Sequence, residues 1–338
     1  MEIQHSKLTE AAILNNTPAS MVFQPEKESL SEWQKRAEEK LIELTGLSEE
    51  RCELLFEKEY ESEHDTFTEI RFTFQSEKGE FVPCHLWLPK ETEYEKPPVM
   101  ICLQGHSTGM HISMGRIKHP GDESSVSSGD RDFAVQCIEN GMAAVSLEQR
   151  CFGERGGNPR PDCYEASMRA ILTGRTIIGG RVKDIMCLID VLEDKFNEII
   201  NTDAIYCMGN SGGGTATFYA AALEKRIKAA IPSCAFATFK GSIGAMYHCA
   251  CNYIPGIAKY FDMAEIAGLI APRPLVIVSG KEDGIFPLDT AQHEFSRLKE
   301  IYYKNSEFPE NCVHVIGSEG HRFYKTPSWD VFRELINK

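Results

Sequence analysis

The chain has 338 residues, of which 42% are hydrophobic, 25% charged and 9% aromatic, and its formal net charge is −14. These fractions are typical of a globular protein and exclude a collagen, a coiled coil and a disordered chain. Residues 1–95 carry 22 acidic and 10 basic side chains, so most of the net charge lies there. A nucleic-acid partner is not expected, because phosphate attracts basic surfaces.

No run of about 18 apolar residues is present, so we expect no membrane-spanning helix. The first five residues lack the basic and apolar regions of a signal peptide, and we expect a cytoplasmic protein. Most of the 12 cysteines stand singly in apolar runs, where they behave as small buried hydrophobic residues. The one close pair is Cys249-Ala250-Cys251, and no CxxC occurs. Free thiols are therefore favoured over a disulfide or zinc framework.

The first 95 residues are predicted to form an N-terminal extension. Residues 1–28 are polar with scattered apolar positions, and we expect them to wrap the surface. In 31–47, apolar residues recur at i, i+4, i+8 and i+11 from Trp33, and Gly46 follows, which predicts an amphipathic helix and its end. Residues 66–88 alternate around a polar turn at 77–80, which predicts a β-hairpin that joins the edge of a sheet.

From residue 97 onward, short apolar runs alternate with helical patterns. The runs lie at 99–103, 143–147, 204–208, 227–231, 275–279 and 312–316, and the helical patterns at 133–140, 177–192, 215–223, 291–302 and 329–336. Continuous short strands separated by helices predict an α/β domain over 96–338, with a mostly parallel sheet flanked by helices. Residues 237–270 interrupt this rhythm and are predicted to form a short cap between two late strands.

The segment Gly209–Gly214 follows an apolar strand and opens an apolar helix. A GxSxG sequence in this context is typical of a nucleophile elbow, where small neighbours permit a tight turn. The N-terminus of the helix would offer N–H groups to a developing oxyanion. A simple glycine-rich turn or a phosphate loop is the alternative, but no lysine follows as a P-loop requires. Ser211 is therefore the predicted nucleophile.

A serine hydroxyl needs a base to remove its proton and a carboxylate to orient that base. Asp283 follows the 275–279 strand and His321 follows the 312–316 strand. This is the chain order Ser, Asp, His of the α/β-hydrolases. Glu282 and Asp289 are rivals for the acid. His314 lies within its strand and is predicted to be packed there.

A tetrahedral intermediate also needs two N–H donors. We expect them from the main chain of Gly212 and of His106, the latter in the loop after the 99–103 strand. Glu148 and Arg150 follow the 143–147 strand at the edge where α/β folds bind ligands, and are candidates for substrate contact. A structural ion pair that locks the loops is favoured over substrate contact for these two residues. Tyr253 in the cap is a candidate pocket residue, although ordinary packing explains it equally well.

Four segments make the chain resemble an α/β-hydrolase of the acetyl xylan esterase and dienelactone-hydrolase-like group. They are 103–106, 148–154, 209–213, and 270–275 leading to Asp283 and His321. The resemblance covers about residues 30–338 and implies a serine esterase that acts on acylated carbohydrates or other small esters without a cofactor. Dienelactone hydrolases proper use cysteine where this chain has Ser211, which disfavours their chemistry here.

The sequence thus predicts a metal-independent serine carboxylic ester hydrolase that works through an acyl-enzyme, with a small ester, possibly on a sugar, as its partner. One alternative is a serine peptidase or amidase of the prolyl-oligopeptidase type. Those enzymes generally carry a large additional domain, and only about 95 residues precede the hydrolase core here. Another alternative is a catalytically silent binding module, which the complete set of triad positions disfavours. A homo-oligomer is left open.

Overall fold

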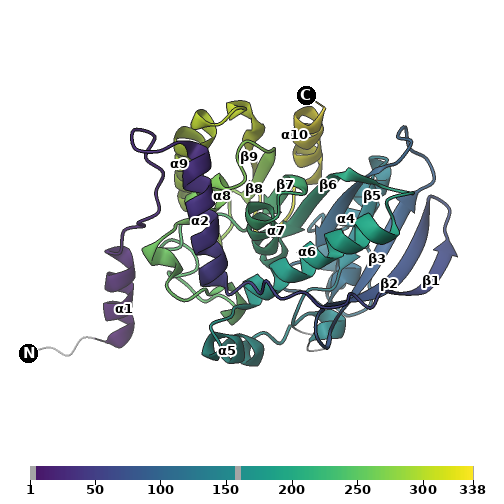
Figure 1. The fold of residues 1–338 in the computed structure, drawn as a ribbon, viewed down its shortest axis with the longest axis horizontal. Coiled ribbons are helices and arrows are strands. Elements are labelled where there is room, and N and C mark those ends of the chain that lie inside the picture. The colour runs from purple at the N-terminus through teal and green to yellow at the C-terminus, as the bar shows by residue number, and fades with distance from the viewer. Residues whose placement is uncertain (1–4, 157–160, 338) are drawn as a thin grey trace, which may run out of the picture.

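The computed structural model describes residues 5–156 and 161–337. Within these ranges, nine strands form one sheet in the order β1-β2-β3-β5-β4-β6-β7-β8-β9 (Figure 1). The strands are β1 (Glu57–Glu63), β2 (Phe67–Glu77), β3 (Glu80–Pro89), β4 (Pro98–Leu103), β5 (Ala143–Leu147), β6 (Asn201–Asn210), β7 (Ile227–Ser233), β8 (Leu275–Gly280) and β9 (Cys312–Gly317).

The strands from β4 to β9 pair in parallel, whereas β1, β2 and β3 are antiparallel and reach the sheet through the β3–β5 pair. All six runs predicted after residue 97 are strands, and the mostly parallel sheet is confirmed. In a parallel sheet all carboxyl ends meet at one edge. The loops after β4, β6, β8 and β9 therefore emerge on the same side of the molecule.

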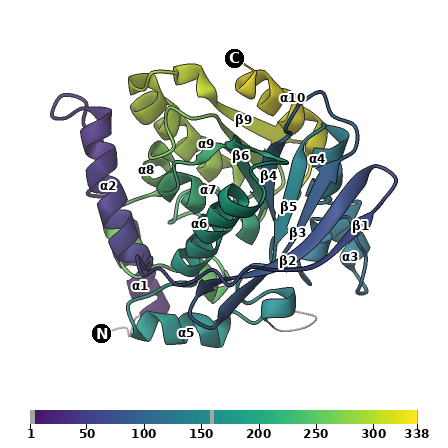
Figure 2. The ribbon, with the colours of Figure 1, turned by 45° about the vertical axis from the view of Figure 1, so that its right-hand side comes forward.

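Helices cover both faces of the sheet. The helices of the described chain are α1 (Ser6–Asn15), which does not contribute to the core, α2 (Leu30–Thr45), α3 (Asp122–Val126), α4 (Phe133–Glu139), α5 (Tyr164–Leu172), α6 (Ile177–Lys195), α7 (Gly212–Leu223), α8 (Met263–Gly268), α9 (Leu288–Arg297) and α10 (Lys325–Ile336). Successive strand residues point to opposite faces. Accordingly Ile101 belongs to a buried apolar cluster that includes residues of α2, α6, α7 and α8, and Met100 belongs to a second cluster with residues of α4 and α10. Figure 2 shows α6 in front of the sheet, with α2 on the left.

The N-terminal segment is attached by packing as well as by strand pairing. Helix α2 begins with a capping box between Ser29 and Glu32 and ends at Gly46, whose φ is +61°. Trp33 is fully buried, and its indole Nε1 donates to the carbonyl of Met21 at 2.6 Å. The boundary at residue 95 stays a prediction, because β2 and β3 belong to the same sheet as the later strands.

Several elements differ from the sequence prediction, which named neither α3 nor α5. Residues 6–15 form α1, which has no buried residue, and residues 57–63 form the largely exposed strand β1. The helix predicted at 291–302 begins at Leu288, ends at Arg297 and continues as a π-helical turn over Leu298–Tyr302. Residues 237–270 hold the 3-10 turns Ala250–Asn252 and Ile257–Lys259 before α8. In the described part of the chain, no helix combines the length and apolar character that crossing a bilayer requires.

Candidate active site

Ser211 occupies the sharp turn between β6 and α7. Its φ and ψ are +58° and −122°, a conformation that costs an ordinary residue about 1–3 kcal/mol and is concentrated at functional sites. A β-carbon on Gly209 would lie 2.8 Å from the carbonyl oxygen of Leu103, and one on Gly213 would collide with the same oxygen. Glycine at both positions therefore lets the elbow pack against the end of β4.

Asp283 and His321 meet at the carboxyl ends of β8 and β9. Asp283 Oδ2 lies 2.8 Å from His321 Nδ1, and its other oxygen accepts the main-chain N–H groups of Ile285 at 2.8 Å and Phe286 at 3.1 Å. Burial alone would raise the pKa of Asp283, but the hydrogen bond with His321 and these amides outweigh it and lower the pKa. The carboxylate is therefore ionised and fixed. The rivals Glu282 and Asp289 are exposed.

Phe286 links this pair to the pocket of Ser211. Its ring stacks on the His321 imidazole with centroids 6.2 Å apart, and it lines the same pocket as Ser211. The sequence analysis did not single out Phe286. The available signal was that an apolar residue lies three positions after Asp283. Among the described residues, no hydrogen bond joins Ser211 Oγ to His321. Such bonds are often long without substrate and shorten when it binds.

The loop after β4 lies against the elbow. A β-carbon on Gly105 would stand 2.8 Å from the carbonyl oxygen of Asn210, and the imidazole of His106 packs on Gly212. In the described residues, no main-chain carbonyl accepts from the amide of His106 or of Gly212. The first N–H groups of a helix have no partner within the helix. In this part of the chain, the amides of His106 and Gly212 therefore remain candidates for the oxyanion donors.

The pocket at Ser211 has a volume of about 560 Å³. Four of its lining residues come from the cap, namely Tyr247, His248, Cys249 and Asn252, and others come from the loop after β4 and from Ile285 and Phe286. Tyr253, in contrast, lines a separate groove beside α1, and its hydroxyl donates to the carbonyl of Ile243 at 3.0 Å. The cap thus contributes to the pocket, but through residues just before Tyr253.

Glu148 lies behind the pocket rather than in its lining. It is 2% exposed, and its carboxylate accepts the Gln104 side-chain amide at 2.7 Å and the main-chain N–H of Met110 at 3.1 Å. Gln149 also donates to the carbonyl of Gln104. Residues 148–149 therefore hold the loop that carries His106 in place. They contribute to the site indirectly, through the position of that loop.

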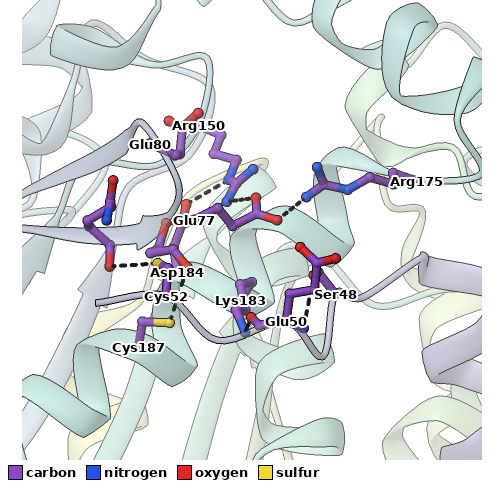
Figure 3. Close-up of polar contacts among 12 residues, drawn as sticks. Ser48, Glu50, Cys52, Glu77, Glu80, Arg150, Arg175, Lys183, Asp184 and Cys187 are labelled. Atoms are coloured by element: carbon purple, nitrogen blue, oxygen red, sulfur yellow. Dashed lines mark hydrogen bonds and ion pairs between the residues drawn. The ribbon is translucent and has the colours of Figure 1, made fainter. Parts of the chain in front are cut away.

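Arg150 lies in a buried ion-pair cluster with Asp184 and Glu77 (Figure 3). Its guanidinium contacts Asp184 of α6 at 2.8 Å and Glu77 at the end of β2 at 2.6 Å. Arg155 pairs with the other oxygen of Asp184 at 2.7 Å and with Glu80 at 2.6 Å. The cluster joins the N-terminal hairpin to α6, and Arg150 is absent from the lining of the Ser211 pocket. These contacts favour a structural role for Arg150, although its partners are Asp184 and Glu77 and not Glu148.

Two groups of side chains in the described residues have metal-ligating atoms within 4.8 Å of one another. One contains Asp283 and His321 together with Cys234, whose thiol donates to the carbonyl of Arg322 at 3.2 Å. Since the Asp283 carboxylate and the His321 imidazole form a hydrogen bond with each other, this group fits a catalytic pair better than a set of metal ligands. The other consists of His106, Cys163, Cys249 and Cys251. The sequence offered the 249–251 pair as its only signal.

No family model matches the chain. "Putative hydrolase YtaP" of Bacillus subtilis (strain 168) is 26% identical over 249 residues, which span 72% of this chain and 79% of that protein. A "putative acetyl xylan esterase" from Bacteroides fragilis NCTC 9343 superposes with a TM-score of 0.75 at 16% identity, over 97% of this chain and 85% of that chain. A glucuronoyl esterase from Solibacter usitatus gives 0.66 at 13% identity, over 95% and 97%. These likenesses establish the predicted α/β-hydrolase fold.

Proposed function

We propose that this protein, which has the α/β-hydrolase fold, is a serine carboxylic ester hydrolase that deacylates a carbohydrate or another small ester. The observation that carries the proposal is the hydrogen bond between buried Asp283 and partly exposed His321, beside the pocket of a strained elbow serine. Structural neighbours that are named as esterases of acetyl xylan and of glucuronoyl groups support the class of bond. Fold alone does not determine function, so the proposal depends on the site.

In the acylation step, Ser211 Oγ attacks the carbonyl carbon of the ester while His321 Nε2 takes the hydroxyl proton. The carbonyl oxygen becomes an oxyanion, which accepts hydrogen bonds from the main-chain N–H groups of Gly212 and His106. The intermediate collapses when the carbon–oxygen bond to the alcohol breaks. His321 donates its proton to that oxygen, and the alcohol leaves an acyl group on Ser211.

In the deacylation step, water takes the place of the alcohol. His321 removes a proton from the water, the hydroxide attacks the acyl carbon, and the same two amides stabilise the second oxyanion. Collapse breaks the bond to Ser211 Oγ, which recovers its proton from His321. Asp283 remains ionised throughout, because the bonds described above lower its pKa, and it stabilises the imidazolium that forms in each step.

The pocket supports a small ester with a polar alcohol. Its volume of about 560 Å³ is in the range of small-molecule sites, and His248, Asn252 and Tyr247 offer polar groups beside the apolar Phe286. Tyr247 is 93% exposed, so a sugar that extends out of the pocket has an aromatic surface to stack on. A cytoplasmic location is part of the proposal, since all cysteines of the described chain are free.

The experiment is labelling with a fluorophosphonate probe, followed by mass mapping of the modified peptide. We expect one adduct, on Ser211, which is lost in Ser211→Ala and in heat-denatured protein. Turnover is then compared on acetylated xylo-oligosaccharides, methyl glucuronates, aryl acetates and peptide anilides.

Faster turnover of the sugar esters than of peptide anilides is the expected result. Preference for the anilides would replace the esterase with a peptidase or amidase. An unlabelled Ser211, under conditions that label a control hydrolase, would favour a silent binding module.

A further inference from the structure

A small cluster of sulfur atoms lies beside the pocket, outside the triad. Cys163 precedes α5, Cys249 precedes the 3-10 turn Ala250–Asn252 of the cap, and Cys251 lies within that turn. They share an apolar cluster with Cys151 and Phe152. Chain segments that are far apart in sequence thus bring four of the 12 cysteines together. Such a gathering is more than the burial of single cysteines requires.

His106 completes a set of four ligand atoms. Its Nε2 lies 3.1 Å from Cys251 Sγ, and the ligand atoms of His106, Cys163, Cys249 and Cys251 all lie within 4.8 Å of one another. A tetrahedral zinc ion with Zn–S bonds of about 2.3 Å needs sulfur atoms about 3.8 Å apart. Shifts of about 1 Å or less therefore bring the four atoms to coordinating distance.

Arg181 provides a second, independent observation. Its guanidinium is 1% exposed, and it donates to Cys251 Sγ at 3.5 Å, to Cys163 Sγ at 3.9 Å and to the carbonyl of Arg150 at 3.0 Å. Among the described residues, no carboxylate forms an ion pair with it, and its Nε has no partner. A buried cation needs a compensating anion. The atoms in the position of that anion are the sulfur atoms of the cluster.

We propose that Cys163, Cys249, Cys251 and His106 bind one zinc ion. Three cysteines and one histidine form an established structural zinc set, and thiolate ligands select zinc over magnesium or calcium. Cysteine binds zinc as a thiolate. The three thiolates then balance the charge of the zinc ion and of Arg181 together, so the buried guanidinium acquires its counter-ion.

The zinc ion is structural, because four protein ligands leave no position for a reacting water. It ties the start of α5 and the cap turn to the side chain of His106, whose main chain is a proposed oxyanion donor. The Nε2 of that ring faces the metal, and its Nδ1 side packs on Gly212. The inference does not depend on the esterase proposal, since the metal site exists whether or not Ser211 turns over esters.

The first test is the metal content of the full chain, purified under reducing conditions without chelator, by plasma mass spectrometry. We expect one zinc ion per chain. Zinc is then exchanged for Co²⁺ alone, and we expect thiolate-to-cobalt charge-transfer absorption together with the visible bands of tetrahedral cobalt. This spectrum is recorded on the unaltered chain, so it does not depend on whether a variant folds.

The variants Cys251→Ser and Cys163→Ser should each lose most of the bound metal and weaken the charge-transfer band. Cys187→Ser is the matched control, because Cys187 is also buried, lies on the same helix as Arg181, and donates through sulfur to the carbonyl of Ser76. A serine hydroxyl can replace that bond. The control should bind metal as the unaltered chain does.

Three results would overturn the proposal. The chain could carry no zinc and show no cobalt–thiolate band after reconstitution. Metal could remain bound in both Cys251→Ser and Cys163→Ser. Intact-mass measurement under native, non-reducing conditions could show the loss of two hydrogens, with peptide mapping that places a disulfide within the cluster. Loss of esterase activity without loss of metal would bear only on the proposed function.

Discussion

A β-carbon on residue 212 would stand 2.7 Å from Nδ1 of His106, so the imidazole of His106 packs directly on the main chain of Gly212. These two residues carry the proposed oxyanion donors. The side chain of one donor residue therefore contacts the backbone of the other, and we expect the spacing between the two amides to depend on this contact.

Gly212→Ala tests that dependence. The added methyl group pushes the His106 loop away from the elbow, while the N–H of residue 212 is kept. We expect kcat on an aryl acetate to fall by roughly 10- to 100-fold, somewhat less than removal of a whole donor costs. Gly284→Ala is the control, because a β-carbon there meets no atom within 4 Å. Equal kcat values for the two variants would show that the packing does not set the donor geometry.

Asp283→Asn tests the identity of the acid. The amide cannot hold the imidazole in its required tautomer, and we expect kcat to fall by about 10⁴-fold. Glu282→Gln and Asp289→Asn are the controls, since both rivals are exposed and should keep nearly full activity. Steady-state kinetics on one substrate decide the matter. A larger loss in either control than in Asp283→Asn would reassign the acid.

Much of the fold could be predicted because local pattern and burial agree. The continuous apolar runs such as Val99–Leu103 are buried on both faces of the sheet, which is why they could be read as parallel strands. Strand β1 could not be found, since its residues are exposed and polar and only pairing with β2 makes them a strand. Helix α1 has no buried residue, so its sequence shows no apolar face from which a helix could be predicted.

In the candidate site, too, some residues could be predicted from the sequence and others could not. Ser211, Asp283 and His321 could be named in advance because each follows a strand whose carboxyl end must reach the same edge. The ion-pair partners of Arg150 could not be predicted, since Asp184 and Glu77 come from elements distant in the sequence. Position after a strand places a residue near the edge, but only the tertiary contacts show whether its side chain points to the pocket.

Glu148 makes stability depend on pH. Burial raises its pKa from 4.5 to about 7, against the opposing effect of the main-chain amides of Met110 and Glu154. A carboxyl group whose pKa is higher in the folded state costs nothing below its unfolded pKa, and it lowers stability as pH rises from about 4.5 to about 7. The full loss above that range is on the order of 3 kcal/mol.

Glu148→Gln should remove this dependence, because the glutamine amide does not titrate in this pH range. Its oxygen still accepts hydrogen bonds. We expect the variant to be more stable than the unaltered chain near pH 8, and the two to be similar at about pH 4.5, as measured by urea unfolding. Glu165→Gln, an exposed glutamate, serves as the control. An unaltered chain that gains stability relative to Glu148→Gln as pH rises would show that the pKa of Glu148 is not raised.

Arg150→Ala separates the structural role of Arg150 from contact with substrate. The variant leaves Asp184, which is completely buried, with Arg155 as its remaining guanidinium partner. Removal of one partner from a buried ion pair costs about 3–5 kcal/mol. Because Arg155 stays in place, we expect about 3 kcal/mol of lost unfolding free energy in chemical denaturation. KM should be unchanged at a temperature where the variant is folded.

Arg169→Ala is the matched control for Arg150→Ala. Its guanidinium pairs with Glu165 at 2.7 Å, but the two side chains are 77% and 66% exposed, and such pairs contribute at most about 1 kcal/mol. A raised KM in Arg150→Ala with unchanged stability would place the guanidinium on the substrate. A loss of stability in Arg150→Ala without a change in KM would establish that Arg150 acts by joining the N-terminal hairpin to α6, outside the lining of the Ser211 pocket.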